Sequence, residues 1–307
     1  LVIMSRALDE IEAQKIINDV RDSIKKKKEE GEEEVTSVSK LFHPSLRLVL
    51  AIGLVIGILQ QITGINSVFF YAPMIFEQSG IGTDASFSQA ILVGLINLAF
   101  TVLAISLIDR LGRKPLLVFG VSGMAIALFI LAYGFSSATY ELTDESVSKL
   151  SAEIDQSLVT PYVGKMYDND LAFKADMSEA IGELEFKKYE SQFLTAAVDM
   201  NAVLILVGIL GFVASFAVSI GPVMWVLFSE LFPNWIRGVA ISFVGLINSA
   251  ISFLVQVIFP WELEVLGSAT TFFLYGAFAV LGLIFIIMKV PETKGKSLEE
   301  LEAILVK

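Results

Sequence analysis

Three amide side chains stand close together in one apolar stretch of the chain: Gln60, Gln61 and Asn66. Each amide offers hydrogen-bond donors and acceptors, and the three lie within about two turns if the stretch is helical. Such a group suits a neutral ligand with several hydroxyl groups. A carboxylate or phosphate ligand would need Arg or Lys, which the middle of this stretch lacks. The alternative interpretation is that the amides only join helices by hydrogen bonds.

Three further residues could take part in the same chemistry. Asn97 and Asn248 lie in other apolar stretches, where an amide either joins helices or contacts a ligand. Trp225 follows Gly221-Pro222, a pair that interrupts helical hydrogen bonding. Its indole offers a flat apolar face and one N–H donor, which suits stacking on a sugar ring. A tryptophan at the membrane interface is the alternative.

The elements that must position these residues are six long apolar stretches with very few charges inside them. Each reaches the roughly 20 residues that a helix needs to cross a bilayer, and backbone groups in lipid must be satisfied within the helix. We therefore expect an all-α membrane protein with six transmembrane helices. The stretches cover 46–76, 87–108, 115–138, 198–229, 238–259 and 268–289.

The composition indicates the same class of protein. Of 307 residues, 55% are hydrophobic and 18% are charged, and the mean hydropathy is +0.71; soluble domains carry about 25% charged residues. The net charge of −11 argues against nucleic acid as a partner, and the lack of cysteine excludes disulfides and thiolate metal sites. With one histidine, His43, and no paired carboxylates inside the apolar stretches, we expect no enzyme activity, no metal and no cofactor.

The basic residues predict the orientation in the membrane. If the six helices alternate in direction, every Lys and Arg outside 139–197 falls on one side. We therefore expect a multi-pass protein of the cell membrane, either a bacterial inner membrane or a plasma membrane, with both termini cytoplasmic. Residues 1–45 are predicted to form cytoplasmic linker helices, and 290–307 a cytoplasmic tail.

A polar, acidic segment at 139–197 separates helices one to three (46–138) from helices four to six (198–289). It contains five lysines, and its apolar residues could line short amphipathic helices. The topology places this insertion outside the cytoplasm. It is interpreted first as a tolerated surface insertion, with a cap over the entrance to a site as the alternative.

Two short loops on the predicted cytoplasmic side carry dense charge. Asp109-Arg110-Leu111-Gly112-Arg113-Lys114 joins the second and third stretches, while Glu230 and Arg237 flank the turn after the fourth. Arginines in such loops either anchor the topology or form an ion-pair latch that opens in another conformation.

Five motifs in order resemble the C-terminal half of the sugar porter family of the major facilitator superfamily. The resemblance covers residues 1–138 and 198–307, nearly everything except the acidic insertion, which is not typical of the family. The motifs are Gln60-Gln61-Ile62-Thr63-Gly64-Ile65-Asn66, Asp109–Lys114, Gly221-Pro222-Val223-Met224-Trp225, Ser229-Glu230-Leu231-Phe232-Pro233 with Arg237, and Pro291–Glu300.

The resemblance implies a twelve-helix transporter of two six-helix halves, each built from two inverted three-helix repeats. This chain would supply the second half, and the N-terminal half would be missing from it. The family's sugar contacts correspond to Gln60, Gln61, Asn66, Asn97 and Trp225, with Asn248 as a further polar contact. Its cytoplasmic charge network, which holds the outward-facing state, corresponds to Arg110, Arg113, Glu230, Arg237 and the segment 291–295 with Glu292.

The function expected from these residues and this resemblance is transport of a monosaccharide by alternating access, with membrane lipid as the surroundings. The chain leaves open whether transport is uniport or proton symport, because a first-span acid would lie in the other half. The alternative is a non-transporting membrane sugar sensor, which the short 18-residue tail after Lys289 argues against.

Overall fold

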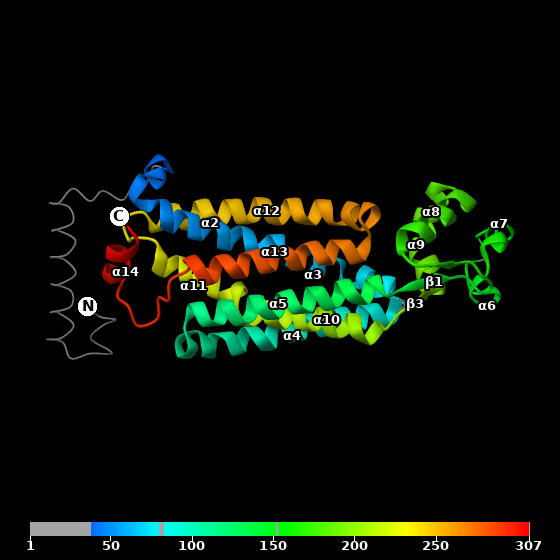
Figure 1. Cartoon of the computed structure of the whole chain (residues 1–307), viewed down its shortest axis with the longest axis horizontal. Coiled ribbons are helices and arrows are strands. Elements are labelled where there is room, and N and C mark those ends of the chain that lie inside the picture. Colours follow the sequence, from blue (N-terminus) through cyan, green and yellow to red (C-terminus); the bar gives the residue numbers. More distant parts are fainter. Residues whose placement is uncertain (1–37, 80–82, 152, 307) are drawn as a thin grey trace, which may run out of the picture.

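The computed structural model describes residues 38–79, 83–151 and 153–306. Six segments of this part are long and apolar enough to cross a membrane, which confirms the predicted all-α membrane architecture. They run side by side in one bundle (Figure 1). Their helices are α2 (Arg47–Ile62) with α3 (Ile65–Gln78), α4 (Thr83–Leu111), α5 (Arg113–Ser136), α10 (Ala202–Val218) with α11 (Ile220–Leu231), α12 (Arg237–Val265) and α13 (Gly267–Lys289).

The predicted linker helices lie outside the described residues as far as position 37. Residues 38–46 form two 3-10 turns, η2 (Val38–Phe42) and η3 (Pro44–Leu46), that lead into α2. After α13, the chain crosses to the short helix α14 (Leu298–Leu305), whose Ser297 and Glu300 form a capping box. The start of α2, α14 and the C-terminus lie at the same end of the bundle (Figure 1).

The first helix of each three-helix unit is broken near its middle. The first span breaks at Gly64, which has φ +83, and the hydroxyl of Thr63 donates to the carbonyls of Leu59 and Gln60 at the end of α2. The fourth span breaks at Ser219, between α10 and α11. Breaks at corresponding positions in the two units fit the inverted repeats that the resemblance implies, and such breaks are where transporters place their binding sites.

Gly64 is required at the first break for two reasons, and its replacement tests the break. A Cβ atom there would lie 2.2 Å from the Tyr275 ring, and a side chain at φ +83 is strained. We expect Gly64→Ala to lower the free energy of unfolding by at least about 2 kcal/mol, measured as a lower melting temperature in detergent. Gly211→Ala is the control, because its Cβ would meet Ala127 at an ordinary 3.7 Å. Equal melting temperatures for the two variants would contradict this account of the break.

The helices are unequally covered by the rest of the bundle. In the most apolar window of the first span, 67% of the residues are buried, but in those of α4 and α12 only 17% are. Both α4 and α12 present apolar side chains outward, among them Leu98 and Ile105 on α4 and Phe253 and Val257 on α12. Two long helices of this six-helix unit therefore have extensive faces that the described residues do not cover.

The largest difference from the predicted boundaries lies at the end of the fifth stretch. The fifth stretch was expected to end at 259, but α12 continues to Val265 with Pro260 inside it. Proline removes one backbone donor, the one that would bond the carbonyl of Gln256 four residues earlier. The hydroxyl of Tyr71 on α3 donates to that carbonyl instead, at 3.4 Å. A side chain from a neighbouring helix thus satisfies the acceptor that Pro260 leaves free.

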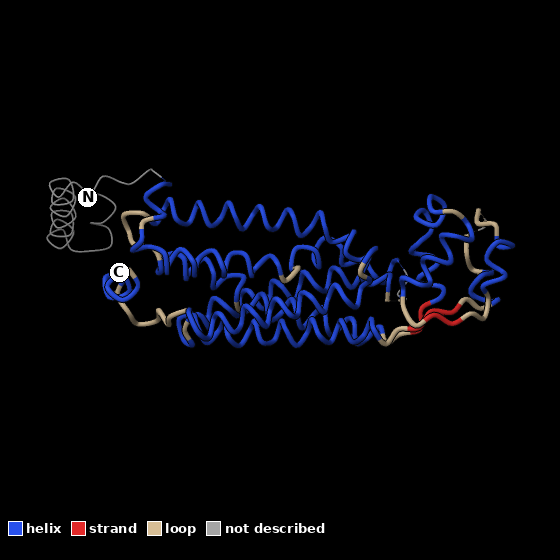
Figure 2. Tube along the Cα trace, turned by 45° about the horizontal axis from the view of Figure 1, so that its top comes forward, coloured by secondary structure: helices blue, strands red, loops and turns tan. Residues whose placement is uncertain are grey.

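The acidic insertion is a small folded unit at the end of the bundle opposite the C-terminus (Figure 1). Its helices are α6 (Asp144–Ser148), α7 (Gln156–Val159), the 3-10 turn η4 (Thr160–Tyr162), α8 (Asp170–Ile181) and α9 (Glu183–Ala197). A three-stranded antiparallel sheet, in the order β2-β1-β3, joins it to the bundle, as Figure 2 shows in red. Its strands are β1 (Thr139–Glu141), β2 (Met166–Tyr167) and β3 (Val198–Asp199).

The insertion has a core of its own. Tyr140, Phe173 and Phe193 are buried in it, whereas Leu158 on α7 and Leu184 on α9 are exposed. On its surface, hydrogen bonds from Lys165 and then from Tyr167 hold the pKa of Asp176 below its usual range. The acidic segment is thus a structured unit as well as a polar connection.

Polar contacts fix the insertion to the bundle. The Ser191 hydroxyl on α9 donates to the Glu77 carboxylate at the end of α3, at 2.8 Å. Asp170, at the start of α8, accepts from the backbone N–H of Ser268 at 3.3 Å. The insertion therefore touches the ends of both α3 and α13, although the sequence gives no sign of these contacts.

Candidate functional site

Three amides meet at the first helix break. Gln60, Gln61 and Asn248 are each less than 10% exposed. The side chain of Gln61 donates to Gln60 Oε1 at 3.1 Å and to Asn248 Oδ1 at 3.2 Å. Asn248, on α12, donates to Gln60 Oε1 at 2.9 Å and to the carbonyl of Gly57 at 2.8 Å. These bonds hold the side chains in fixed orientations before any ligand arrives.

Asn66 connects α3, the helix beyond the break, to these three amides. It lies one residue into α3 and donates to Gln61 Oε1 at 2.8 Å and to the Ser252 hydroxyl at 2.7 Å. The amide cluster, defined as Gln60, Gln61, Asn66 and Asn248, therefore draws on α2, α3 and α12. The break at Gly64 is what allows Gln61 and Asn66, on different helices, to bond each other.

The amide cluster also reaches the second break. Gln60 Nε2 lies 3.3 Å from the carbonyls of Ile220 and Gly221, in the first turn of α11. The two interrupted spans thus meet at a buried glutamine. This contact joins two of the sequence motifs, which lie about 160 residues apart in the chain.

A groove of about 510 Å³ opens beside the cluster, between α3 and α12. Among the described residues, none of those that line it is charged, so it offers neutral donors and acceptors. That chemistry fits a ligand rich in hydroxyl groups, and a groove of this size is large enough for a small ligand. The lining residues are Gln61, Asn66, Tyr71, Asn248, Ser249, Ser252, Phe253, Gln256 and Val257.

Two of the predicted contact residues stand apart from this groove. Trp225 on α11 is 47% exposed and meets Phe228 edge-on, with ring centroids 6.0 Å apart. Asn97 is half-buried on α4 and makes no side-chain hydrogen bond to any described residue. Neither lines the groove. The groove instead gains Ser252, which the sequence predictions omitted although it lies one turn beyond Asn248.

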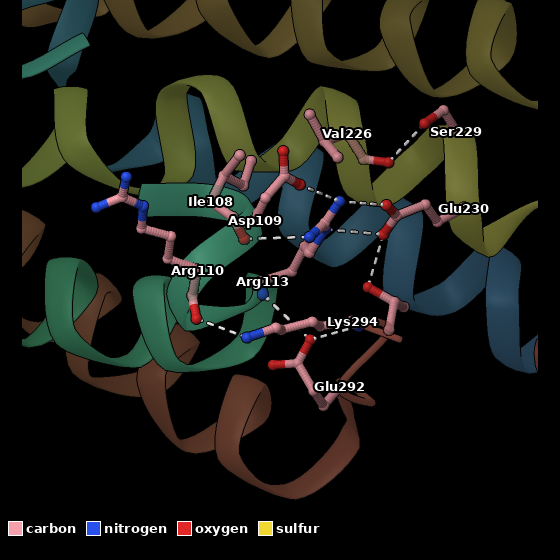
Figure 3. Close-up of polar contacts among 10 residues, drawn as sticks. Ile108, Asp109, Arg110, Arg113, Val226, Ser229, Glu230, Glu292 and Lys294 are labelled. Carbon is pink, nitrogen blue, oxygen red and sulfur yellow. Dashed lines mark hydrogen bonds and ion pairs between the residues drawn. The ribbon is translucent and has the colours of Figure 1, made fainter. Parts of the chain in front are cut away.

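A second polar site lies at the end of the bundle near the C-terminus, centred on Arg113 (Figure 3). Its guanidinium forks onto the Glu230 carboxylate, with N–O distances of 3.1 and 2.7 Å, and lies 3.1 Å from Asp109. Arg113 is only 11% exposed and Glu230 is 22% exposed, so solvent screens this pair weakly. The fork joins the start of α5 to the end of α11.

Glu292 connects the segment after α13 to the same place. Its carboxylate accepts the backbone N–H groups of Arg113 and Lys114, each at 3.1 Å. These are free donors in the first turn of α5, where a negative charge also complements the helix dipole. The Thr293 hydroxyl donates to Glu230 at 2.6 Å. The charge network, defined as Arg113, Glu230 and Glu292, therefore ties three separate segments together.

The other two arginines predicted for this network take different positions. The Arg110 side chain points away from Glu230, and only its backbone carbonyl takes part, accepting from Lys294 at 2.6 Å (Figure 3). Arg237 donates to the carbonyl of Phe232 at 3.0 Å and forms no ion pair with any described acidic residue. In this conformation, Arg113 is the arginine that pairs with Glu230.

Comparison with known proteins fits this architecture. The family profile described as "Sugar (and other) transporter" matches residues 4–152 and 187–305, which leaves out the middle of the insertion. The arabinose-proton symporter of Bacillus subtilis is 30% identical over 311 residues, which cover 100% of this chain and 52% of that protein. The D-xylose-proton symporter of Escherichia coli K12 is 34% identical over 262 residues, which cover 83% of this chain and 41% of that protein.

Solved structures show the same relationship. The proton:xylose symporter XylE bound to 6-bromo-6-deoxy-D-glucose aligns with a TM-score of 0.59 and 33% identity, over 84% of this chain and 44% of that one. An inward-open form of XylE from E. coli aligns with a TM-score of 0.60 and 29% identity, over 99% and 49%. The chain thus spans about half the length of the relatives it matches, with the fold of half a major facilitator protein. It belongs to the sugar (and other) transporter family.

Proposed function

We propose that the full-length protein carrying this chain transports a monosaccharide across a membrane by alternating access. The observation that supports this most is the amide cluster: three of its four amides line a neutral groove, and the fourth, Gln60, joins the two broken spans beside it. Relatives named arabinose-proton and D-xylose-proton symporters point to the same class of substrate. The protein would change conformation around the bound sugar without covalent chemistry, so we propose that it is not an enzyme.

The energetics suit a carrier. A neutral hydrogen bond contributes only about 1 kcal/mol net, so a few amide–hydroxyl bonds would give weak, reversible binding. A carrier needs such binding, because it must release its solute on the other side. Asn97 and Trp225 lie apart from this groove, and we propose that they add a polar contact and a stacking face to the whole cavity, which the upstream half completes.

An upstream six-helix half is the proposed partner of this chain. The groove is open along α12, and the outward faces of α4 and α12 are apolar and uncovered by the described residues. A second half would close the groove, and membrane lipid would cover the remaining apolar surface. The relatives, about twice as long as this chain, leave room for that half.

We propose that the charge network and both termini lie in the cytoplasm, and that residues 139–197 lie outside it. The basic residues Arg110, Arg113, Lys114 and Arg237 all lie at the end of the bundle away from the insertion, in accord with the positive-inside rule. The membrane would be the cell membrane. There the charge network stabilises one conformation, which we assign as outward-facing.

We also propose coupling to protons, on the strength of the two symporter relatives. The part of the groove formed by the described residues contains no carboxylate. The group that binds the proton would therefore belong to the upstream half, while this half supplies the sugar contacts.

The direct test is uptake of radiolabelled D-xylose and L-arabinose by proteoliposomes that contain the full-length protein. We expect uptake that saturates and increases when the outside is made more acidic than the inside. Saturable uptake without a response to the pH gradient would support the assignment as a sugar carrier but refute the coupling to protons. Sugar binding without flux would favour a sensor, and neither binding nor flux would refute the sugar assignment.

A further inference from the structure

The groove extends well beyond the amide cluster. Asn248, Ser252 and Gln256 follow one another at intervals of four residues, so they share one face of α12. At 1.5 Å per residue they span about 12 Å, and all three line the groove. The amide cluster occupies only the inner end of this row.

Ser252 has an unusual set of hydrogen bonds. Its oxygen accepts from Asn66 Nδ2 at 2.7 Å and from Gln256 Nε2 at 2.9 Å. A serine inside a helix often donates to the carbonyl four residues earlier, but Ser252 donates to no described residue. Its hydroxyl proton is therefore still available at the wall of the groove.

The two amides beside Ser252 are complementary to that donor. Asn66 uses both of its side-chain hydrogens, on Gln61 and Ser252, and Gln256 uses its own on the backbone carbonyl and hydroxyl of Ser252. Neither side-chain carbonyl oxygen accepts a hydrogen bond from a described residue. One donor and two acceptors are thus left unpaired side by side.

The position of this group is fixed by its neighbours. Tyr71 donates to the backbone carbonyl that Pro260 leaves free, at 3.4 Å, which ties α3 to α12 at the level of Gln256. Its ring lies against Phe259, with centroids 5.3 Å apart. Phe253 and Val257 form the apolar wall alongside. We name Tyr71, Ser252 and Gln256 the outer shelf.

We propose that the outer shelf binds one particular hydroxyl group of the sugar and so contributes to sugar selectivity. The Ser252 hydroxyl donates a hydrogen bond to that group, and Gln256 Oε1 accepts a hydrogen bond from it, while the amide cluster holds the rest of the ring. This inference rests on the proposed function. It adds that recognition of one hydroxyl depends on Ser252 and Gln256, whereas recognition of the other hydroxyls does not. A site built to bond a hydroxyl discriminates against the analogue that lacks it.

The test uses the full-length protein, with D-xylose, L-arabinose and D-xylose analogues that each lack one hydroxyl. The affinity for each sugar is measured by competition with radiolabelled D-xylose, for the wild type, for Ser252→Ala and for Gln256→Leu. We expect each variant to bind the parent sugar about fivefold more weakly, in the range of one neutral hydrogen bond. The analogue that lacks the recognised hydroxyl should bind the wild type and both variants with equal affinity. The other analogues should still bind the variants about fivefold more weakly than the wild type.

The control is Ser122→Ala, because the Ser122 hydroxyl bonds its own helix at the carbonyl of Val118 and lies outside the groove. It should leave every affinity unchanged. A uniform loss across all analogues, in Ser252→Ala and in Gln256→Leu, would mean that these residues only support the fold and would overturn the outer shelf alone. If the wild type binds none of the sugars, the proposed function fails, and the outer shelf fails with it.

Discussion

Replacement of Gln61 by alanine in the full-length protein is expected to lower sugar uptake about 100-fold or more. Gln61 bonds Gln60 and Asn248 and accepts from Asn66, so it links every part of the amide cluster. Its loss removes the proposed contacts to the sugar and takes from the buried Asn248 Oδ1 the donor that it has in the structure. Two or three neutral hydrogen bonds at about 1 kcal/mol each correspond to roughly this factor.

The measurement is initial uptake into proteoliposomes, normalised to the amount of inserted protein. Gln192→Ala is the control, because Gln192 lies exposed on the insertion, and among the described residues its side-chain oxygen accepts only from the backbone of Ser151. Normal insertion of Gln61→Ala with lost uptake would support the site. Undiminished uptake by this variant would contradict it.

Replacement of Arg113 by alanine is expected to have the largest effect on stability. It removes the fork onto Glu230 and the contact with Asp109, leaving the Glu230 carboxylate mostly shielded from water, with the Thr293 hydroxyl as its one remaining partner among the described side chains. Removing one member of a buried pair costs about 3–5 kcal/mol. Partial exposure of this pair reduces that to about 2–4 kcal/mol. Thermal unfolding in detergent should show a melting temperature several degrees lower.

Two other variants make this test specific. Arg113→Lys should be intermediate, because lysine keeps the charge but cannot fork onto a carboxylate. Arg110→Ala should leave the melting temperature nearly unchanged, because its guanidinium points away from the charge network. If Arg110→Ala and Arg113→Ala lower the melting temperature equally, the pairing of Arg113 with Glu230 is not what stabilises this end of the bundle.

The six membrane helices could be predicted because hydrophobic runs of bilayer length leave a helix few alternatives. The details inside them were harder to foresee. Pro260 was expected to follow the end of its helix, but a hydroxyl from another span satisfies the carbonyl that it frees. The strands of the insertion contain two or three residues each, too few for a period-two pattern to be recognised.

The types of residue in the site could also be predicted, since buried amides without charged neighbours indicate a neutral polar ligand. Their partners could not, because the bond between Gln60 and Asn248 joins positions 188 residues apart. The direction in which a side chain points could not be predicted either. Arg110 and Arg113 belong to one motif, yet one points outward and the other forks onto Glu230. Ser252 gave no signal of its own, because a lone serine in a membrane helix is usually bonded to its own backbone.

The central claim is that Gln61, Asn66 and Asn248 hold the hydroxyl groups of a sugar in the groove between α3 and α12. The most direct measurement is a structure of the full-length protein determined with D-xylose or L-arabinose bound. We predict ring density within hydrogen-bond distance of these three amides, with Ser252 facing a hydroxyl. A sugar bound elsewhere, with the groove filled by side chains of the upstream half, would contradict the account.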